Sequence, residues 1–394
     1  MLSFEEALAR LLAAVQPLGR HEELSTFEAL GRVLAAEVIS GLDVPPADNT
    51  AMDGYALRAA DAHLLLPVSQ RIPAGVVGAP LLPGTAARIF TGAQIPAGAD
   101  AVVMQELCEL EGEAVRVKAQ VKTGQHIRRR GEDVRNGSTV LAAGHKLDAA
   151  ALGMAASVGA ATLTVAKALR VALFSTGDEL VMPGEPLKPG AIYNSNRYTL
   201  RGLLQSLGCE VVDLGIVPDR LDATRAALRD AAAQADLIIT SGGVSVGEED
   251  HLRAAVQAEG QLELWQIALK PGKPLAYGRV RDTHFIGLPG NPVSSFVTFL
   301  MLVRPVILRL LGATAVEPHR YTLRADFSWP KPDKRREFLR ARLNAAGGLE
   351  LFPNQGSGVL TSAVWGDGLV TNPPGRAIAA GDTVEFIPFS ELLA

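Results

Sequence analysis

The feature that most constrains the fold is an apolar strand that runs into a glycine turn, at residues 235–251. The apolar run at 236–240, bounded by turn residues, is typical of a strand buried on both faces, as in a parallel sheet. It breaks at Ser241-Gly242-Gly243 and continues as an acidic segment with the character of a helix start. A strand, a glycine turn and a helix N-terminus together present main-chain N–H groups to an anion. On this stretch alone, an ordinary turn with a solvated acidic face is an open alternative.

The surrounding chain predicts an α/β multidomain protein. Strands alternate with helices of 10–15 residues from about residue 169 to 311, which indicates βαβ units in a central parallel or mixed sheet. Short apolar runs between glycine and proline turns indicate β structure at 67–141 and again beyond Gly312. Ser25 and Glu28 form a capping-box pattern that predicts a helix reaching about Val38. We expect an inserted β-rich domain (42–136), a small linking α/β domain (18–41 and 137–168), a central α/β domain (1–17 and 169–316) and a C-terminal β-barrel-like domain (317–394).

Composition excludes several classes of protein. The net charge of −4 argues against nucleic acid as the main partner. Cys108 and Cys209 match no metal-binding spacing and are expected as small core residues in a reducing compartment. The N-terminus has no signal-peptide pattern, and Arg304-Pro305 interrupts the long apolar segment at 293–311, which favours a buried helix over a membrane span. A cytoplasmic protein without a membrane partner is expected.

Polar and glycine-rich segments follow five of the predicted strands. In doubly wound folds these strand ends meet at one edge of the sheet, where ligands bind. The five segments are 175–179, Pro218-Asp219, 241–245 with Asp250, 270–273 and 288–292. Carboxylates beside phosphate-binding turns predict a divalent cation, Mg²⁺, and Lys270 and Lys273 are spaced to converge on one oxyanion. Read alone, a lysine turn of this kind is more often a solvated turn than a binding site. The residues together indicate metal-assisted chemistry on an anionic, phosphorylated substrate.

Other catalytic patterns are missing from the sequence. It has no nucleophile elbow, no Cys/His pairing and no zinc-ligand spacing. It also lacks a P-loop and a dinucleotide-binding glycine motif.

Longer motifs resemble those of the MoeA/gephyrin E-domain family, the molybdopterin molybdenumtransferases. The resemblance covers essentially the whole chain, in family order, in the segments 48–55, 90–93, 128–133, 175–179, 241–250, 270–273 and 287–294. It implies an elongated enzyme that binds adenylylated molybdopterin and molybdate, cleaves the phosphoanhydride, inserts molybdenum and releases AMP. It also implies an upstream molybdopterin adenylyltransferase, and downstream molybdoenzymes or their chaperones.

The resemblance also implies roles for particular residues. The implied catalytic residues are Asp53, Thr91, Asp133, Glu179, Asp219, Asp250 and Lys270. The implied metal ligands are Asp250 first and Asp219 second. The implied substrate- and cofactor-binding residues are Arg128, Ser175, Thr176, Gly177, Ser241, Gly242, Gly243, Ser245, Lys273, Pro289, Asn291, Pro292, Ser294, Arg340 and Ser357.

The resemblance also implies a homodimer, in which the β domain of one subunit closes the cleft of its partner. Asp53, Thr91, Arg128 and Asp133 would then reach the site from the second subunit, while Arg129 and Arg130 are expected in surface salt bridges. Similar proteins tend to carry a basic residue where this chain has Gln266, after Trp265. That leaves one cation fewer in the pocket, unless another arginine compensates.

Two other functions are open alternatives. An adenylyltransferase that makes adenylylated molybdopterin shares the central fold, but the flanking β domains and the loops at 49–55 and 128–133 disfavour it. A non-catalytic gephyrin-like scaffold is disfavoured by the retained Asp53, Asp219, Asp250, Lys270 and Lys273.

Overall fold

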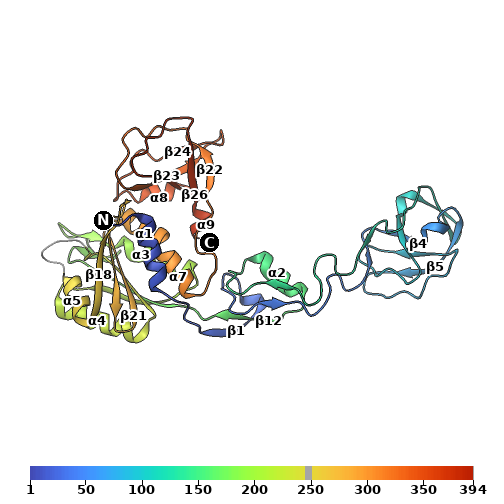
Figure 1. Cartoon of the computed structure of the whole chain (residues 1–394), viewed down its shortest axis with the longest axis horizontal. Helices are drawn as coiled ribbons and strands as arrows, with labels where there is room; N and C mark the ends of the chain where they lie inside the picture. Colours follow the sequence, from blue (N-terminus) through green and yellow to red (C-terminus); the bar gives the residue numbers. More distant parts are fainter. Residues whose placement is uncertain (245–250, 394) are drawn as a thin grey trace.

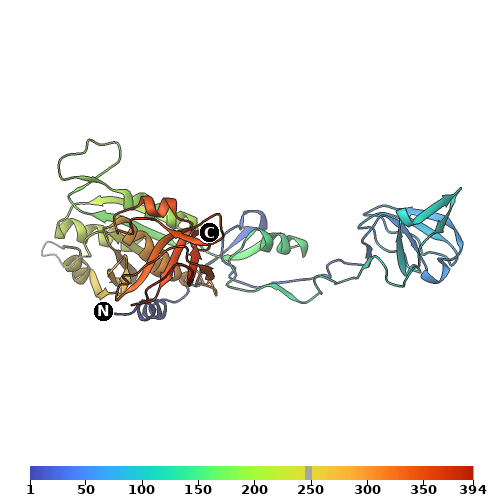
Figure 2. The ribbon, with the colours of Figure 1, turned by 90° about the horizontal axis from the view of Figure 1, so that it is seen from above.

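The chain is elongated, with its largest α/β unit at one end and a small β unit at the other. The computed structural model describes residues 1–244 and 251–393. The α/β unit carries the C-terminal β unit against it, and a narrow connecting region with α2, β1 and β12 leads to the distal β unit (Figures 1 and 2). The division of the chain into four parts remains our prediction.

The central sheet has six strands in the order β16-β13-β17-β21-β20-β18. The strands are β13 (Arg170–Thr176), β16 (Glu210–Val217), β17 (Leu237–Ser241), β18 (Gly260–Gln266), β20 (Pro274–Val280) and β21 (Thr283–Leu288). The first four in sheet order are parallel. Strand β20 is antiparallel to both of its neighbours, so β18 again runs in the direction of the first four. Five strands therefore end at the same edge, as the sequence predicts.

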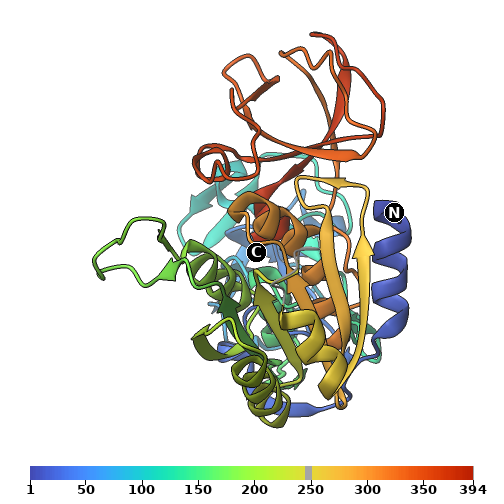
Figure 3. The same cartoon turned by 90° about the vertical axis from the view of Figure 1, so that its left-hand side faces the viewer.

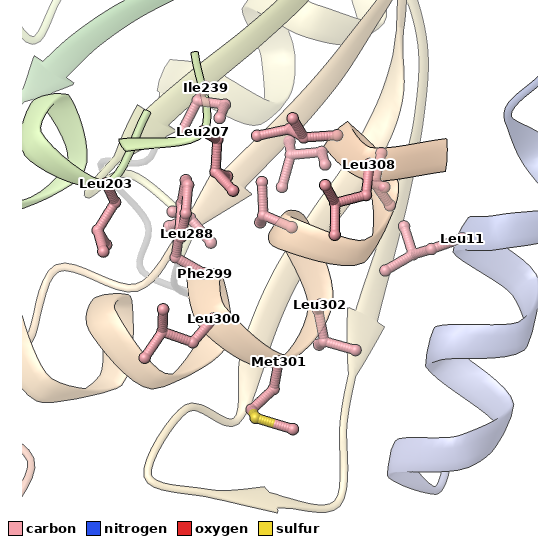
Figure 4. Packing of buried hydrophobic residues seen from close by; sticks show 14 of the residues in the cluster. Leu11, Leu203, Leu207, Ile239, Leu288, Phe299, Leu300, Met301, Leu302 and Leu308 are labelled. Carbon is pink, nitrogen blue, oxygen red and sulfur yellow. The ribbon is translucent and has the colours of Figure 1, made fainter. Parts of the chain in front are cut away.

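Helices cover both faces of this sheet, which is why β17 and β21 are buried along their full length. One face packs against α4 (Leu221–Gln234) and α5 (His251–Glu259). The other packs against α1 (Phe4–Ala14), α3 (Ser195–Ser206) and a long apolar helix (Figures 3 and 4). Leu302 of that helix has no solvent exposure, so truncating it to alanine should cost about 2–5 kcal/mol.

The long helix is a core element. It comprises α6 (Pro292–Thr298), the wider π-helical turn Phe299–Val303 and α7 (Arg304–Leu310). Among the described residues it is the one helix long and apolar enough to cross a membrane, with a mean hydropathy of 1.7. However, 94% of that span is buried inside the chain. The sequence prediction of a buried helix is thus confirmed.

The connecting region and the distal unit are mostly β. The connecting region contains β1 (His21–Ser25), β2 (Val38–Ile39), β11 (Thr139–Leu141), α2 (Ala149–Ser157) and β12 (Thr162–Ala166). The distal unit contains β3 (Asn49–Thr50), β4 (Gly54–Leu57), β5 (Leu65–Ile72), β6 (Ala86–Ile89), β7 (Ala101–Met104), β8 (Cys108–Glu111), β9 (Ala114–Val117) and β10 (Ile127–Arg128). Six of these strands form one sheet, in the order β7-β4-β6-β5-β9-β8. This confirms the β structure predicted at 67–141.

The predicted helix from Ser25 to Val38 is wrong. Ser25 does act as a cap, because its side chain accepts a hydrogen bond from the Phe27 main-chain nitrogen, but the helix is a single 3₁₀ turn at Thr26–Glu28. Gly31 then adopts a positive φ of 76°, which ends the helical path. The buried Val33 and Leu34 instead make β-bridges to Lys146 and Val165. Ser25 thus caps only a single turn, and the apolar spacing at 30–38 belongs to an extended segment.

The C-terminal unit is a sheet in the order β19-β23-β25-β26-β22, with β24 paired to β23. Its elements are β22 (Tyr321–Arg324), β23 (Arg336–Leu343), β24 (Leu349–Leu351), α8 (Thr361–Trp365), β25 (Gly368–Asn372), β26 (Thr383–Pro388) and α9 (Phe389–Leu393). The buried strand β25 was not predicted. Strand β19 (Leu269–Lys270) comes from the central part of the chain and pairs in parallel with β23. That pairing fixes the C-terminal unit beside the strand edge.

Candidate functional site

A cleft of ≈ 580 Å³ lies at the strand edge, where all five parallel strands end. Its lining residues come from the five strand ends and from the C-terminal unit. They are Thr176, Gly177, Glu179, Asp219, Gly242, Gly243, Val244, Lys270, Pro271, Gly272, Lys273, Pro274, Pro289, Gly290, Asn291, Ser294, Arg335, Gln355, Gly356 and Ser357. The predicted site residues of the central part therefore do converge.

The turn after β17 is tightly packed against the end of β13. Gly242 has a φ of +88°, and a Cβ there would lie 2.6 Å from the Thr176 carbonyl oxygen, so only glycine fits without displacement. Ser175 and Ser241 are buried beneath this turn with their hydroxyl oxygens 3.3 Å apart. Neither serine lines this cleft, so the direct binding role expected for Ser175 is not supported; the hydroxyls instead bond each other below the glycine turn.

The lysine turn supplies two cations, and the C-terminal unit supplies a third. Lys270, Lys273 and Arg335 all line the cleft, and we call them the cationic wall. The Lys270 ammonium lies 3.1 Å from a Glu337 carboxylate oxygen and 3.4 Å from an Asp333 oxygen. Arg335 pairs with the same Asp333 at 2.8 Å. Hydrogen bonding from Arg335 holds the pKa of Asp333 well below its usual range, so that carboxylate stays ionised beside both cations.

Arg335 was missed at the sequence level. Gln266, which replaces an expected cation, is exposed and does not line the cleft. Arg335 lines the cleft, and a compensating role for it remains a prediction. The only sequence signal was the basic run at 331–336 before a strand, and such runs are usually solvated. The pairing of β19 with β23 brings Arg335 to the site.

Two carboxylates line the cleft in the described part of the chain, Glu179 and Asp219. Asp219 is held next to the β13 turn, where its main-chain nitrogen donates to Asp178 Oδ1 at 3.3 Å. The predicted Ser245 and Asp250 lie outside the described residues. Within residues 1–244 and 251–393, no three His, Cys, Asp or Glu side chains group as a metal site. Two carboxylates beside an anion-binding cleft fit Mg²⁺, which uses few protein ligands and completes its shell with phosphate oxygens and water.

Arg340 does not line the cleft, contrary to the expected contact with molybdate. Its side chain has no solvent exposure, and burial lowers the pKa of its guanidinium to about 10. The guanidinium donates to Ser362 Oγ at 3.0 Å and to the Gly356 carbonyl at 3.3 Å. Gly356 and the predicted Ser357 do line the cleft. Arg340 therefore holds the loop that carries them, because its buried guanidinium bonds the Gly356 carbonyl within that loop.

The end of β21 forms the floor between this cleft and a neighbouring cavity. Pro289, Asn291 and Ser294 line the cleft, whereas Pro292 lines only the second cavity, of ≈ 550 Å³. Thr176, Glu179, Gly242, Gly290 and Asn291 line both. The predicted residues at 289–294 are thus divided between two connected spaces.

Four predicted site residues lie in the distal unit, away from the cleft of their own chain (Figure 1). They are Asp53, Thr91, Arg128 and Asp133. Asp53 Oδ1 accepts hydrogen bonds from the main-chain nitrogen and from Oγ1 of Thr91, both at 2.7 Å. The main-chain bond is the larger cause that lowers the pKa of Asp53 below its usual value.

The two neighbouring arginines are surface ion pairs, as expected. Arg129 bonds Asp48 at 2.7 Å, and Arg130 bonds Asp43 at 2.5 Å.

Comparisons with known proteins cover nearly the whole chain. Residues 2–159 match the model of the MoeA N-terminal region (domain I and II), residues 172–309 that of a probable molybdopterin binding domain, and residues 322–389 that of the MoeA C-terminal region (domain IV). The chain is 41% identical to a molybdopterin molybdenumtransferase of Haemophilus influenzae, with 100% of both chains covered. It is 33% identical to that of Bacillus subtilis, covering 98% of this chain and 94% of the relative. A crystal structure of the molybdopterin biosynthesis MoeA protein of Pyrococcus horikoshii OT3 superimposes with a TM-score of 0.86, at 28% identity, covering 98% and 100%.

Proposed function

Because this chain belongs to the MoeA family of molybdopterin molybdenumtransferases, we propose that its cleft binds adenylylated molybdopterin with molybdate and inserts the metal into the pterin dithiolene. In this reaction one phosphoanhydride P–O bond breaks, a water oxygen replaces it on phosphorus, and AMP leaves. The two dithiolene thiols bind molybdenum, and one molybdate oxygen leaves as water with the two thiol protons, so molybdenum remains Mo(VI). The observation that carries the proposal is that one cleft combines the cationic wall with Glu179 and Asp219 beside a glycine turn.

The cationic wall suits the two anions of this reaction. A pyrophosphate and a molybdate bring several negative charges into one cleft, and Lys270, Lys273 and Arg335 offset them. Gly242 and Gly243 line the cleft beside the cationic wall, and their lack of side chains lets phosphate oxygens approach the main chain there. Ser294 and Ser357 add hydroxyl donors at the C-terminal side of the cleft.

The carboxylates of the cleft have a separate role. Asp219 would hold Mg²⁺, together with Asp250 as the sequence motif implies. The ion would neutralise charge on the pyrophosphate oxygens. Glu179 would orient water toward phosphorus and accept its proton, because it is the other carboxylate that lines the described part of the cleft.

The distal residues give reason to propose a homodimer with shared sites. Asp53 and Thr91 bond each other at an exposed position far from the cleft of their own chain (Figure 1). A two-fold partner would bring its distal unit over this cleft and complete the site with Asp53, Thr91, Arg128 and Asp133.

We place the protein in the cytoplasm, between an adenylyltransferase that supplies its substrate and molybdoenzymes or chaperones that receive its product.

A single-turnover assay tests the proposal. Protein is mixed with adenylylated molybdopterin, molybdate and Mg²⁺, and AMP release is followed together with reconstitution of an apo-molybdoenzyme. We expect AMP release and active cofactor, both dependent on molybdate and on the divalent ion. Asp219→Asn should raise the Mg²⁺ concentration required for half-maximal release by about tenfold, since one charged ligand is lost. Pterin binding without AMP release would point to a carrier, and the absence of any binding would refute the proposed substrate.

A further inference from the structure

The second cavity contains two buried amides, each with one atom that lacks a hydrogen-bond partner. Asn194 and Asn196 line this space of ≈ 550 Å³ at the first turn of α3. They are 2% and 7% exposed. The structure gives no partner to Asn194 Nδ2 or to Asn196 Oδ1. An unpaired buried polar atom costs about 1–3 kcal/mol, so both atoms mark a place where a ligand would repay that cost.

The orientation of the Asn194 amide is fixed by its helix-capping role. Its Oδ1 accepts from the Arg197 main-chain nitrogen at 3.2 Å and from the Ser175 hydroxyl at 3.5 Å. A main-chain N–H can only donate, so the oxygen must face the helix. The Nδ2 group is therefore left as a donor that faces no protein acceptor.

Asn196 has the opposite arrangement. Its Nδ2 donates to the Gly290 carbonyl oxygen at 2.8 Å, and a carbonyl can only accept. Its Oδ1 is therefore left as an acceptor. Asn194 and Asn196, two residues apart at the start of α3, thus place one unpartnered donor and one unpartnered acceptor beside the cavity.

The rest of the cavity suits a flat ring. Ile192 and Tyr193 of β15 (Ile192–Tyr193) line it and are 55% and 44% exposed, so apolar and aromatic surface is available for stacking. The segment between β14 (Leu180–Val181) and β15 projects from the body beside it (Figures 2 and 3). The cavity shares Thr176, Gly242 and Gly290 with the anion cleft, so one ligand can occupy both.

We propose that this cavity binds a nitrogen heterocycle of the substrate, with Asn194 Nδ2 donating to a ring nitrogen or ring carbonyl and Asn196 Oδ1 accepting from an adjacent N–H, which is the exocyclic amino group in adenine and a ring or amino N–H in pterin. This rests on the proposed function, in which the substrate joins two such rings through a pyrophosphate. Adenine and pterin both carry an adjacent donor and acceptor on one edge. The two asparagines thereby set which ring faces α3 while the phosphates lie in the cleft.

Asn194→Ser is the informative variant. Serine keeps the helix cap through its hydroxyl and adds no charge, but it removes the amide donor. The matched control is Thr240→Val, because Thr240 is buried with an unpartnered Oγ1 yet lines neither cavity. Calorimetric affinities of both variants and the parent are measured for AMP, for pterin-6-carboxylate and for inorganic pyrophosphate.

We expect Asn194→Ser to weaken one ring ligand by about tenfold, with pyrophosphate affinity and the Thr240→Val control unchanged. Loss for AMP assigns the cavity to adenine, and loss for the pterin assigns it to pterin. Unchanged ring affinities, an equal loss for pyrophosphate, or a parent protein that binds neither ring would each overturn the inference. AMP release by the parent in single turnover reports on the proposed function separately. If the parent releases AMP while Asn194→Ser binds both rings normally, this inference alone fails.

Discussion

The Lys270 ammonium lies 3.1 Å from the carboxylate of Glu337, a side chain of the C-terminal sheet with no solvent exposure. The same carboxylate accepts from Trp329 Nε1 at 2.9 Å and from Asn372 Nδ2 at 3.1 Å. One buried acid thus links the cationic wall to the C-terminal core. The position of Lys270 is set by a residue 67 positions away in the chain.

Glu337→Gln should impair both stability and anion binding. The glutamine presents N–H groups to donors, and Lys270 loses its counter-charge, so we expect a loss of about 2 kcal/mol in the free energy of unfolding. Molybdate-dependent AMP release should fall by at least about tenfold, because Lys270 is no longer held. Glu350→Gln is the control, since Glu350 pairs with Arg342 at the surface and should cost under about 1 kcal/mol. Denaturant unfolding measures the stability of the two variants, and single-turnover assays measure their rates of AMP release. Equal effects of the two variants would contradict the role of Glu337 in holding Lys270.

Gly272→Ala should displace the lysine turn. Gly272 has a φ of +121°, and a Cβ there would lie 2.4 Å from Thr298 Oγ1 and 2.8 Å from Leu269 Cδ2. We expect pyrophosphate affinity to fall by about tenfold and stability to fall by about 2–3 kcal/mol from strain and overpacking. Gly190→Ala isolates the backbone effect, because Gly190 has a φ of +85° but open space around it, and it should cost about 1 kcal/mol. Calorimetry and thermal unfolding distinguish the two; normal pyrophosphate binding by Gly272→Ala would show that the turn tolerates a shift.

Stability should decline as pH falls from about 6.5 to about 4. Burial, and secondarily the charge of Arg279, lowers the pKa of His284 from 6.5 to about 4. In that window the unfolded chain binds a proton that the folded chain does not, so stability is complete above the unfolded pKa and is lost toward the folded one. The neutral ring is held against the Tyr277 hydroxyl, with Nδ1 3.0 Å from its oxygen.

His284→Gln should flatten this part of the stability profile. Denaturant unfolding at half-unit pH steps measures the slope, and His319→Gln, at an exposed position, is the control that should leave it unchanged. An identical slope in His284→Gln would assign the acid sensitivity to other groups.

Two inactive variants should complement each other if sites are shared between subunits. Asp53→Ala removes a distal residue and Lys270→Ala a cleft residue, so each homodimer lacks both complete sites. Co-expressed in equal amounts, half of the dimers are mixed and hold one intact site, which predicts about a quarter of parental activity. AMP release from the purified mixture measures it. Activity no higher than that of either variant alone would place Asp53 and Lys270 in one chain's site, or make Asp53 dispensable to the reaction.

Local sequence patterns determined the elements and the strand edge. The apolar run before Gly242 and the β texture of the distal unit can be recognised from the spacing and turn residues of short stretches of sequence. The convergence of Glu179, Asp219, Gly242, Lys270 and Asn291 was also predictable, because parallel strands must end at one edge. Motif spacing could therefore find most of the central cleft.

Long-range packing decided what the sequence could not. The apolar spacing around Val33 and Leu34 suits a helix, but these residues lie in an extended segment. Their β-bridges to Lys146 and Val165 determine that conformation. Arg340 is buried within β23, while the β19–β23 pairing carries Arg335 to the cleft. Burial and pairing between distant segments depend on which face of each strand meets a partner. The pairing that leaves the fewest buried polar groups without hydrogen bonds depends on the whole molecule. A local stretch of sequence therefore does not determine it.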